Sequence, residues 1–122
     1  MDSSEIRSLL QDYFDAGVEF DANKMSGVFH RDAHIYGHGE KGVLKDMDRD
    51  FFVNMVGSAS PSNPPSPRYD EILAIDFTGV DTAVARVKVR IKDTLFTDIL
   101  CFMRLEGKWG VISKVFAGVP TE

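Results

Sequence analysis

A two-residue periodicity dominates the C-terminal half of the chain and restricts the fold to one built around an antiparallel sheet. Over residues 83–91, Ala, Val and Ile occupy one face, while the other face carries Arg and Lys after Val84. This alternation predicts a strand with one buried face. Strands are also predicted over 69–78, 95–105 and 109–117, with turns at 79–81, 92–93 and 106–108. Connections this short favour a meander of neighbouring antiparallel strands.

The N-terminal part has a helical periodicity instead. Apolar residues recur every three or four positions over 4–20, which predicts a helix with one apolar stripe. Asp21 is suited to cap a second, short helix, and either Asp46 or Asp48 could cap a third over about 47–55. We expect a turn at 30–32, a short strand over 33–37 and a proline-rich loop over 58–68. Helices followed by a meander indicate the α+β class, and 122 residues fit one domain.

The strands predicted over 95–105 and 109–117 are apolar on both faces, so both faces of the sheet must be covered. Helices in this layout can cover only one face, so we expect a second copy to cover the other, in a homodimer packed through the outer sheet face. The odd-numbered residues over 83–105 are expected to face an internal cavity, and Asp98, Leu100 and Phe102 to face the partner. The alternative is that the helices or termini wrap further and cover both faces.

Composition and charge exclude several classes of function. A net charge of −5 argues against nucleic acid or an anionic membrane as the main partner. The single cysteine excludes an internal disulfide and a cysteine-rich zinc site. Without an apolar run of about 20 residues or an apolar signal sequence, we expect a cytoplasmic protein. No phosphate-binding loop, dinucleotide fingerprint or metalloprotease motif is present, so we expect no cofactor and no metal.

Three segments carry a resemblance to a known superfamily: FHRDA from Phe29, FTDIL from Phe96 and GKWGVISKVF from Gly107. Together with the order of the elements, they resemble the nuclear transport factor 2-like superfamily, the cystatin-like cone proteins. This superfamily includes ketosteroid isomerase, scytalone dehydratase and the polyketide cyclases, and the chain is most similar to its SnoaL-like branch described as putative lumazine-binding. The resemblance covers about residues 4–118 and implies one domain over 1–122. It implies N-terminal helices packed in the concave face of a strongly curved, mainly antiparallel sheet.

The resemblance also places the residues of the isomerase site on this chain. Tyr13 falls where ketosteroid isomerase has its oxyanion-binding tyrosine. The catalytic base falls on Gly37, which has no side chain, and the protonated acid falls near Cys101. Two of these three groups are therefore missing, and isomerisation by that mechanism is not expected.

Three residues are candidates for catalysis: Tyr13, His38 and Lys114. Lys114 is expected to face an apolar cavity, which would lower its pKa and allow it to bind an anion or act as a base. The alternative is that Lys114 pairs with an acid such as Asp15. His38 follows the vacant base position and could replace that base. His34 lies about 13 Å from His38 along a strand, too far for both to bind one metal. The expected ligand-binding residues are Tyr13, Phe14, Ile35, Phe51, Met55, Val87, Val89, Ile99, Cys101, Met103, Ile112, Lys114 and Phe116.

Two functions follow from these expectations. The first is a homodimeric protein that binds a small apolar or aromatic ring-containing molecule in its cavity. The alternative is a cofactor-free lyase or isomerase, of dehydratase, cyclase or isomerase type, that uses acid–base groups in the same cavity. A protein-interaction module is a third possibility, and its mark would be an apolar patch left exposed after dimerisation.

Overall fold

The structure, a computed structural model, describes residues 2–61 and 66–121. It is α+β, as predicted. The elements in chain order are α1 (Ser4–Glu19), α2 (Ala22–Val28), β1 (Phe29–His38), the short 3₁₀ turn η1 (Glu40–Gly42), β2 (Leu44–Asp48), α3 (Arg49–Ser58), β3 (Asp70–Phe77), β4 (Thr82–Ile91), β5 (Thr94–Leu105) and β6 (Lys108–Pro120). The predicted loop 58–68 starts at the end of α3, and its residues 62–65 lie outside the described residues.

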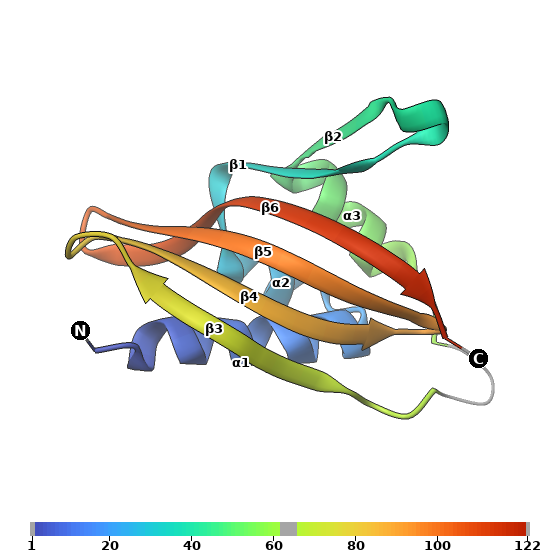
Figure 1. The fold of residues 1–122 in the computed structure, drawn as a ribbon, viewed down its shortest axis with the longest axis horizontal. Helices are drawn as coiled ribbons and strands as arrows, with labels where there is room; N and C mark the ends of the chain where they lie inside the picture. Colours follow the sequence, from blue (N-terminus) through green and yellow to red (C-terminus); the bar gives the residue numbers. More distant parts are fainter. Residues whose placement is uncertain (1, 62–65, 122) are drawn as a thin grey trace.

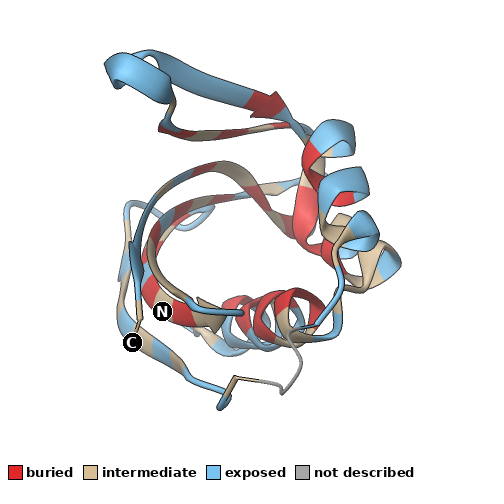
Figure 2. Ribbon diagram, turned by 90° about the vertical axis from the view of Figure 1, so that its right-hand side faces the viewer, coloured by how far each residue is buried: buried red, intermediate tan, exposed pale blue. Residues whose placement is uncertain are grey.

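One curved sheet forms the body of the protein. Its strands run in the order β2-β1-β6-β5-β4-β3, and all neighbours are antiparallel except β1 and β6, which are parallel. Strands β3, β4, β5 and β6 lie side by side with α1 against one face, and β1 and β2 extend the sheet beyond β6 (Figure 1). Seen along the strands, the sheet curls around α1, while α3 lies against the β1 and β2 edge (Figure 2). The predicted packing of the helices in a concave sheet face is confirmed.

Helix boundaries follow the local sequence closely. The α1 stripe of Ile6, Leu10 and Phe14 is buried against the sheet. The Asp21 side chain accepts a hydrogen bond from the Lys24 backbone N–H at 3.0 Å, so the predicted cap of α2 is confirmed. Of the two candidates for α3, Asp48 is the cap and accepts from the Phe51 N–H at 2.8 Å.

The hairpin of β1 and β2 differs from the expectation. Residues 30–32 belong to β1 and form no separate turn, and Met47 lies in β2 rather than in a helix. Only Met47 is buried in β2, so this strand has no alternation that its sequence could reveal. Its pairing with β1, from His34 opposite Asp48 to His38 opposite Leu44, defines the strand instead.

The inward face of β5 is the opposite of the predicted one. Across the two-residue turn, Ile91 of β4 pairs with Thr94, so odd-numbered residues of β4 lie opposite even-numbered residues of β5. Cross-strand partners share a face of the sheet. Asp98, Leu100 and Phe102 are therefore fully buried inside the chain's own core, and their predicted place in a dimer interface is wrong.

A bulge in β6 then changes which of its residues face inward. Cys101 pairs with Ser113 but Phe102 pairs with Val111, so Ile112 is an extra residue between two ladder positions. Before the bulge, Val111 faces the core; after it, Lys114 is buried and Phe116 half-buried on the inner side. The bulge therefore brings a lysine to the concave face of the sheet.

Candidate functional site

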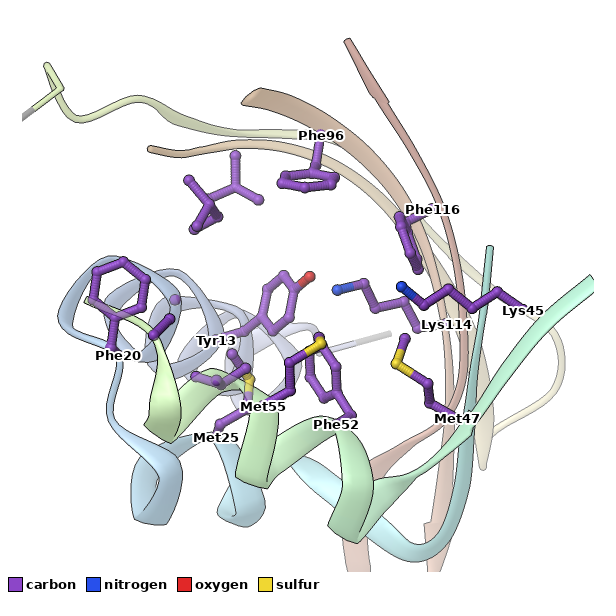
Figure 3. A pocket seen from close by; sticks show the side chains of 15 residues that line it. Tyr13, Phe20, Met25, Lys45, Met47, Phe52, Met55, Phe96, Lys114 and Phe116 are labelled. Carbon is purple, nitrogen blue, oxygen red and sulfur yellow. The ribbon is translucent and has the colours of Figure 1, made fainter. Parts of the chain in front are cut away.

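A cavity of about 370 Å³ lies between α1, α3 and the concave face of the sheet (Figure 3). Its wall is apolar except for the Tyr13 hydroxyl and the ammonium groups of Lys45 and Lys114. Lys45 and Met55 are exposed, so the cavity opens to solvent on the side of β2 and α3. The lining residues are Tyr13, Gly17, Phe20, Met25, Lys45, Met47, Phe52, Met55, Val56, Ala59, Val89, Ile91, Phe96, Lys114 and Phe116.

Lys114 is a buried cation in this apolar wall. Its Nζ lies 4.6, 5.0 and 5.3 Å from the ring centroids of Phe52, Tyr13 and Phe116, distances at which an ammonium is attracted to aromatic faces. In the described part of the chain, no carboxylate oxygen lies within 4.0 Å of this nitrogen. Burial lowers the pKa of Lys114 from its usual 10.5, although the negative charge of Asp98 opposes the shift.

Asp15, the acid that the sequence suggested as a partner for Lys114, forms an ion pair with another residue. Asp15 accepts from the Arg68 guanidinium at 2.5 Å, at the surface of the protein. The lysine is therefore neither neutralised by Asp15 nor extended to the rim of the cavity, and its ammonium group stays inside, with only 7% of the residue exposed.

Tyr13 and Asp98 form a buried hydrogen-bonded pair beside Lys114. The Tyr13 hydroxyl donates to Asp98 Oδ2 at 2.5 Å, and Oδ1 has no partner among the described residues. Burial, followed by the charge of Asp98 and this hydrogen bond, raises the pKa of Tyr13 well above 10. Figure 3 shows the Tyr13 oxygen and the Lys114 nitrogen pointing toward each other inside the cavity. We call Tyr13, Asp98 and Lys114 the polar cluster.

Five of the predicted binding residues line the cavity: Tyr13, Met55, Val89, Lys114 and Phe116. Eight others do not, for four reasons. Phe14, Ile35 and Val87 are core residues, and Ile112 is partly buried at the bulge. Ile99, Cys101 and Met103 face outward because of the register across the turn, and Phe51 is 60% exposed on the outer side of α3.

Sequence reasoning missed much of the lining on α3. Phe52, Met55, Val56 and Ala59 recur at helical spacing, and this stripe faces the cavity instead of the stripe that contains Phe51. The spacing was visible in the sequence, but the adjacent Phe51 made the apolar stripe ambiguous. The other lining residues that were not predicted are Gly17, Phe20, Met25, Lys45, Met47 and Phe96, whereas Ile91 was expected among the odd-numbered residues that face the cavity.

The two positions considered for a base do not supply one. His38 is exposed at the end of β1 and does not line the cavity, so the expectation that it converges with Tyr13 and Lys114 is wrong. At Gly37, an added Cβ would lie 2.5 Å from Phe116 Cζ. An aromatic ring therefore occupies the space that the side chain of an isomerase base would need.

Metal binding and membrane insertion find no support in the described residues. Residues 2–61 and 66–121 contain no group of three or more His, Cys, Asp or Glu side chains placed to hold a metal ion. Within the same ranges, no helix has the length and apolar character needed to cross a membrane. The expected cytoplasmic location and the expected lack of a nucleic-acid partner stay predictions.

An apolar surface lies on the back of the sheet, opposite the cavity. Ile99, Met103 and Val115 are 42%, 36% and 46% exposed there, and Cys101 is half-buried among them. Ile99 pairs directly with Val115, and Cys101 lies opposite Ser113. We call Ile99, Cys101, Met103 and Val115 the outer apolar face.

Comparisons with known proteins agree with this architecture. An NTF2-like protein of unknown function from Shewanella baltica OS155 has a TM-score of 0.86 and 28% identity, over 97% of this chain and 94% of that one. Another, from Silicibacter pomeroyi DSS-3, has a TM-score of 0.83 and 26% identity, over 98% of this chain and 100% of that one. A curated relative named "Aldolase FrzH", from Cladobotryum sp, is 26% identical over 113 residues, 88% of this chain and 84% of the relative.

The sequence also matches a family as a whole. The family described as "Putative lumazine-binding" matches residues 1–117, which is nearly the entire chain. The neighbouring structures carry the same NTF2-like, cystatin-like fold. The protein thus belongs to the "Putative lumazine-binding" family of NTF2-like proteins.

Proposed function

We propose that this protein binds a small, largely apolar, ring-containing molecule whose oxygen-bearing or anionic group meets Lys114. The observation that carries the proposal is an apolar cavity with a buried ammonium and a hydroxyl in its wall. Ligand sites are typically concave, mostly apolar and equipped with a few placed polar groups. The description of the family as lumazine-binding supports a flat ring as the ligand.

The size and chemistry of the cavity limit the ligand further. A volume of about 370 Å³ lies near the lower end of the usual range for ligand pockets, so a molecule of two or three fused rings fits better than a larger one. Phe52, Phe96 and Phe116 offer ring faces and edges for stacking. A negative group in the ligand would supply the close partner that Lys114 lacks among the described residues.

A series of naphthalene derivatives that differ only in their polar group tests this proposal. Melting temperatures are measured with 2-naphthoate, 2-naphthylmethanol and 2-naphthylmethylamine, with lumazine as a fourth compound. We expect the rise in melting temperature to decrease from the carboxylate to the alcohol to the amine, because only the carboxylate can neutralise the positive charge of Lys114. The Lys114→Met variant should lose the preference for the carboxylate and keep binding of the alcohol. No shift with any compound, or the strongest shift with the amine, would contradict the proposal.

The proposed functional unit is a homodimer formed through the outer apolar face. The support is the exposure of neighbouring apolar side chains on β5 and β6, which a second copy of the sheet would cover. Sedimentation equilibrium tests it on Val115→Lys, with Val80→Lys as the matched control in the turn before β4. We expect the wild type and the control to sediment as dimers and Val115→Lys as a monomer. A monomeric wild type would refute the dimer without affecting the ligand proposal.

A cofactor-free lyase or isomerase is the second candidate function. Its support is the meeting of a lysine and a hydrogen-bonded tyrosine in one cavity, together with the relative named "Aldolase FrzH". In this function Lys114 removes a proton next to a ligand carbonyl and Tyr13 stabilises the oxyanion. The test is deuterium exchange into the methyl group of 2-acetylnaphthalene in D₂O, followed by NMR. Exchange no faster than with the Lys114→Met variant would rule out this activity.

A further inference from the structure

Lys114 has the features of a nucleophilic amine as well as those of a binding cation. Its Nζ lies against the aromatic walls of the cavity, and in the described ranges no carboxylate lies within 4.0 Å to hold it as an ammonium. By comparison, Lys24 is bound to Glu19 at 3.0 Å, and Lys45, which also lines the cavity, is exposed to solvent. The charged and titratable groups around Lys114 are Tyr13 on α1, Asp98 on β5 and Lys45 on β2.

We propose that Lys114 forms an imine with an apolar aldehyde or ketone held in the cavity. This covalent step rests on the ligand-binding site proposed above. The neutral amine attacks the carbonyl carbon, a C–N bond forms, and the carbonyl π electrons move to the oxygen. The carbinolamine then loses its C–O bond as the nitrogen lone pair forms C=N.

The step is balanced without any further reagent. Of the three protons on the Lys114 ammonium, two leave with the carbonyl oxygen as water and the third remains on the nitrogen of the iminium product. The Tyr13 hydroxyl, hydrogen-bonded to Asp98 and pointing toward Lys114, is placed to pass a proton between nitrogen and oxygen (Figure 3). Asp98 is not itself a lining residue, so it acts through Tyr13 as a positioning residue.

Two features of the site favour the imine once it is formed. The iminium is a cation, so it keeps the attraction of the rings of Phe52, Tyr13 and Phe116 around the nitrogen. The nitrogen is buried, with only 7% of Lys114 exposed, which limits the access of the water that would hydrolyse the product. Burial also lowers the pKa of Lys114, which raises the fraction of reactive neutral amine at neutral pH.

Reductive trapping tests the inference directly. The protein is incubated with 2-naphthaldehyde and sodium cyanoborohydride at neutral pH, and adducts are measured by intact mass and located by peptide mapping. We expect the first adduct on Lys114, ahead of every exposed lysine, because burial lowers its pKa. An adduct there blocks tryptic cleavage and yields the peptide from Trp109 to Glu122. Lys114→Met should remove the fast phase, and the control Lys108→Met, exposed on the same strand, should keep it.

The outcomes separate this inference from the binding proposal. Thermal stabilisation by 2-naphthaldehyde without a preferred adduct on Lys114 would overturn the imine and leave ligand binding standing. No stabilisation and no preferred adduct would overturn both. Because mapping of the wild type alone identifies the reactive lysine, the result does not depend on whether Lys114→Met folds.

Discussion

Removing the Tyr13 hydroxyl provides a quantitative test of the polar cluster. In Tyr13→Phe the aromatic ring and its packing remain, but Asp98 loses the hydrogen bond that Oδ2 accepts at 2.5 Å. Its Oδ1 already has no partner among the described residues, and the residue is fully buried. The variant therefore leaves a buried carboxylate with neither oxygen bonded.

The expected destabilisation follows from these contacts. A hydrogen bond to a charged group contributes about 1.5–3 kcal/mol, and breaking a buried pair costs about 3–5 kcal/mol, so we expect a loss of about 3 kcal/mol. A domain of this length has an unfolding entropy of about 0.26 kcal/mol/K near its midpoint, which converts the loss into a fall of about 12 °C in Tm. The assay is urea unfolding followed by the fluorescence of Trp109, the single and buried tryptophan.

A double-mutant cycle distinguishes the hydrogen bond from a general effect of the substitution. The double variant Tyr13→Phe with Asp98→Leu removes both polar groups, and it should recover most of the loss because no buried polar atom of the pair remains. Tyr36→Phe, at a half-exposed tyrosine of β1, should change stability by less than about 0.5 kcal/mol. Additive single effects, or a Tyr13→Phe loss no larger than that of Tyr36→Phe, would refute the reasoning.

Three further predictions concern the pH dependence of stability and the packing around the cavity. Asp46 lies 2.6 Å from His34 Nδ1 and raises the pKa of that exposed histidine. The pair therefore stabilises the fold below pH about 6.5 and loses this effect as the pH rises through the raised pKa. NMR titration of Asp46→Asn should show a lower His34 pKa, and an equal pKa would refute the pairing. Because burial lowers the pKa of Lys114, the wild type should gain stability relative to Lys114→Met as the pH rises toward 10.5. Urea unfolding across this range measures the difference in free energy of unfolding between the two proteins, and a constant difference would contradict the burial. Gly37→Ala places a methyl group 2.5 Å from Phe116 Cζ and should push the ring into the cavity, weakening 2-naphthoate binding about tenfold; unchanged affinity would show that the ring has room elsewhere.

Several features could be predicted from the sequence because their causes are local. The apolar stripe of α1 and the alternation of β4 specify which face each element buries, whatever the neighbours are. The carboxylate of Asp21 caps the helix that follows it immediately, so tertiary contacts do not affect the prediction. The three motif segments similarly indicated the family, since their residues are contiguous in the chain.

Which side chains form the site could not be predicted, because strand pairing decides it and no local sequence pattern contains that information. Strand β5 is apolar on both faces, so periodicity alone could not tell its inner side from its outer side. The pairing of Ile91 with Thr94 decides this by placing Asp98 beneath Tyr13, and it leaves Ile99 on the outer surface. Lys114, by contrast, was singled out from the sequence as an inward-facing group, and the structure buries it at the cavity; its role stays a proposal.

The sequence by itself therefore determined the class of fold, the Asp21 cap of α2 and the candidacy of Lys114, because each depends on residues within a few positions of one another. Only the tertiary structure decided that Lys114 shares a cavity with a tyrosine bound to Asp98, and that His38 does not. The physical reason is strand register: one turn length and one bulge at Ile112 reverse which side chains point inward. A one-residue change in the turn would exchange the faces of Asp98 and Ile99, and loss of the bulge would exchange those of Lys114 and Val115.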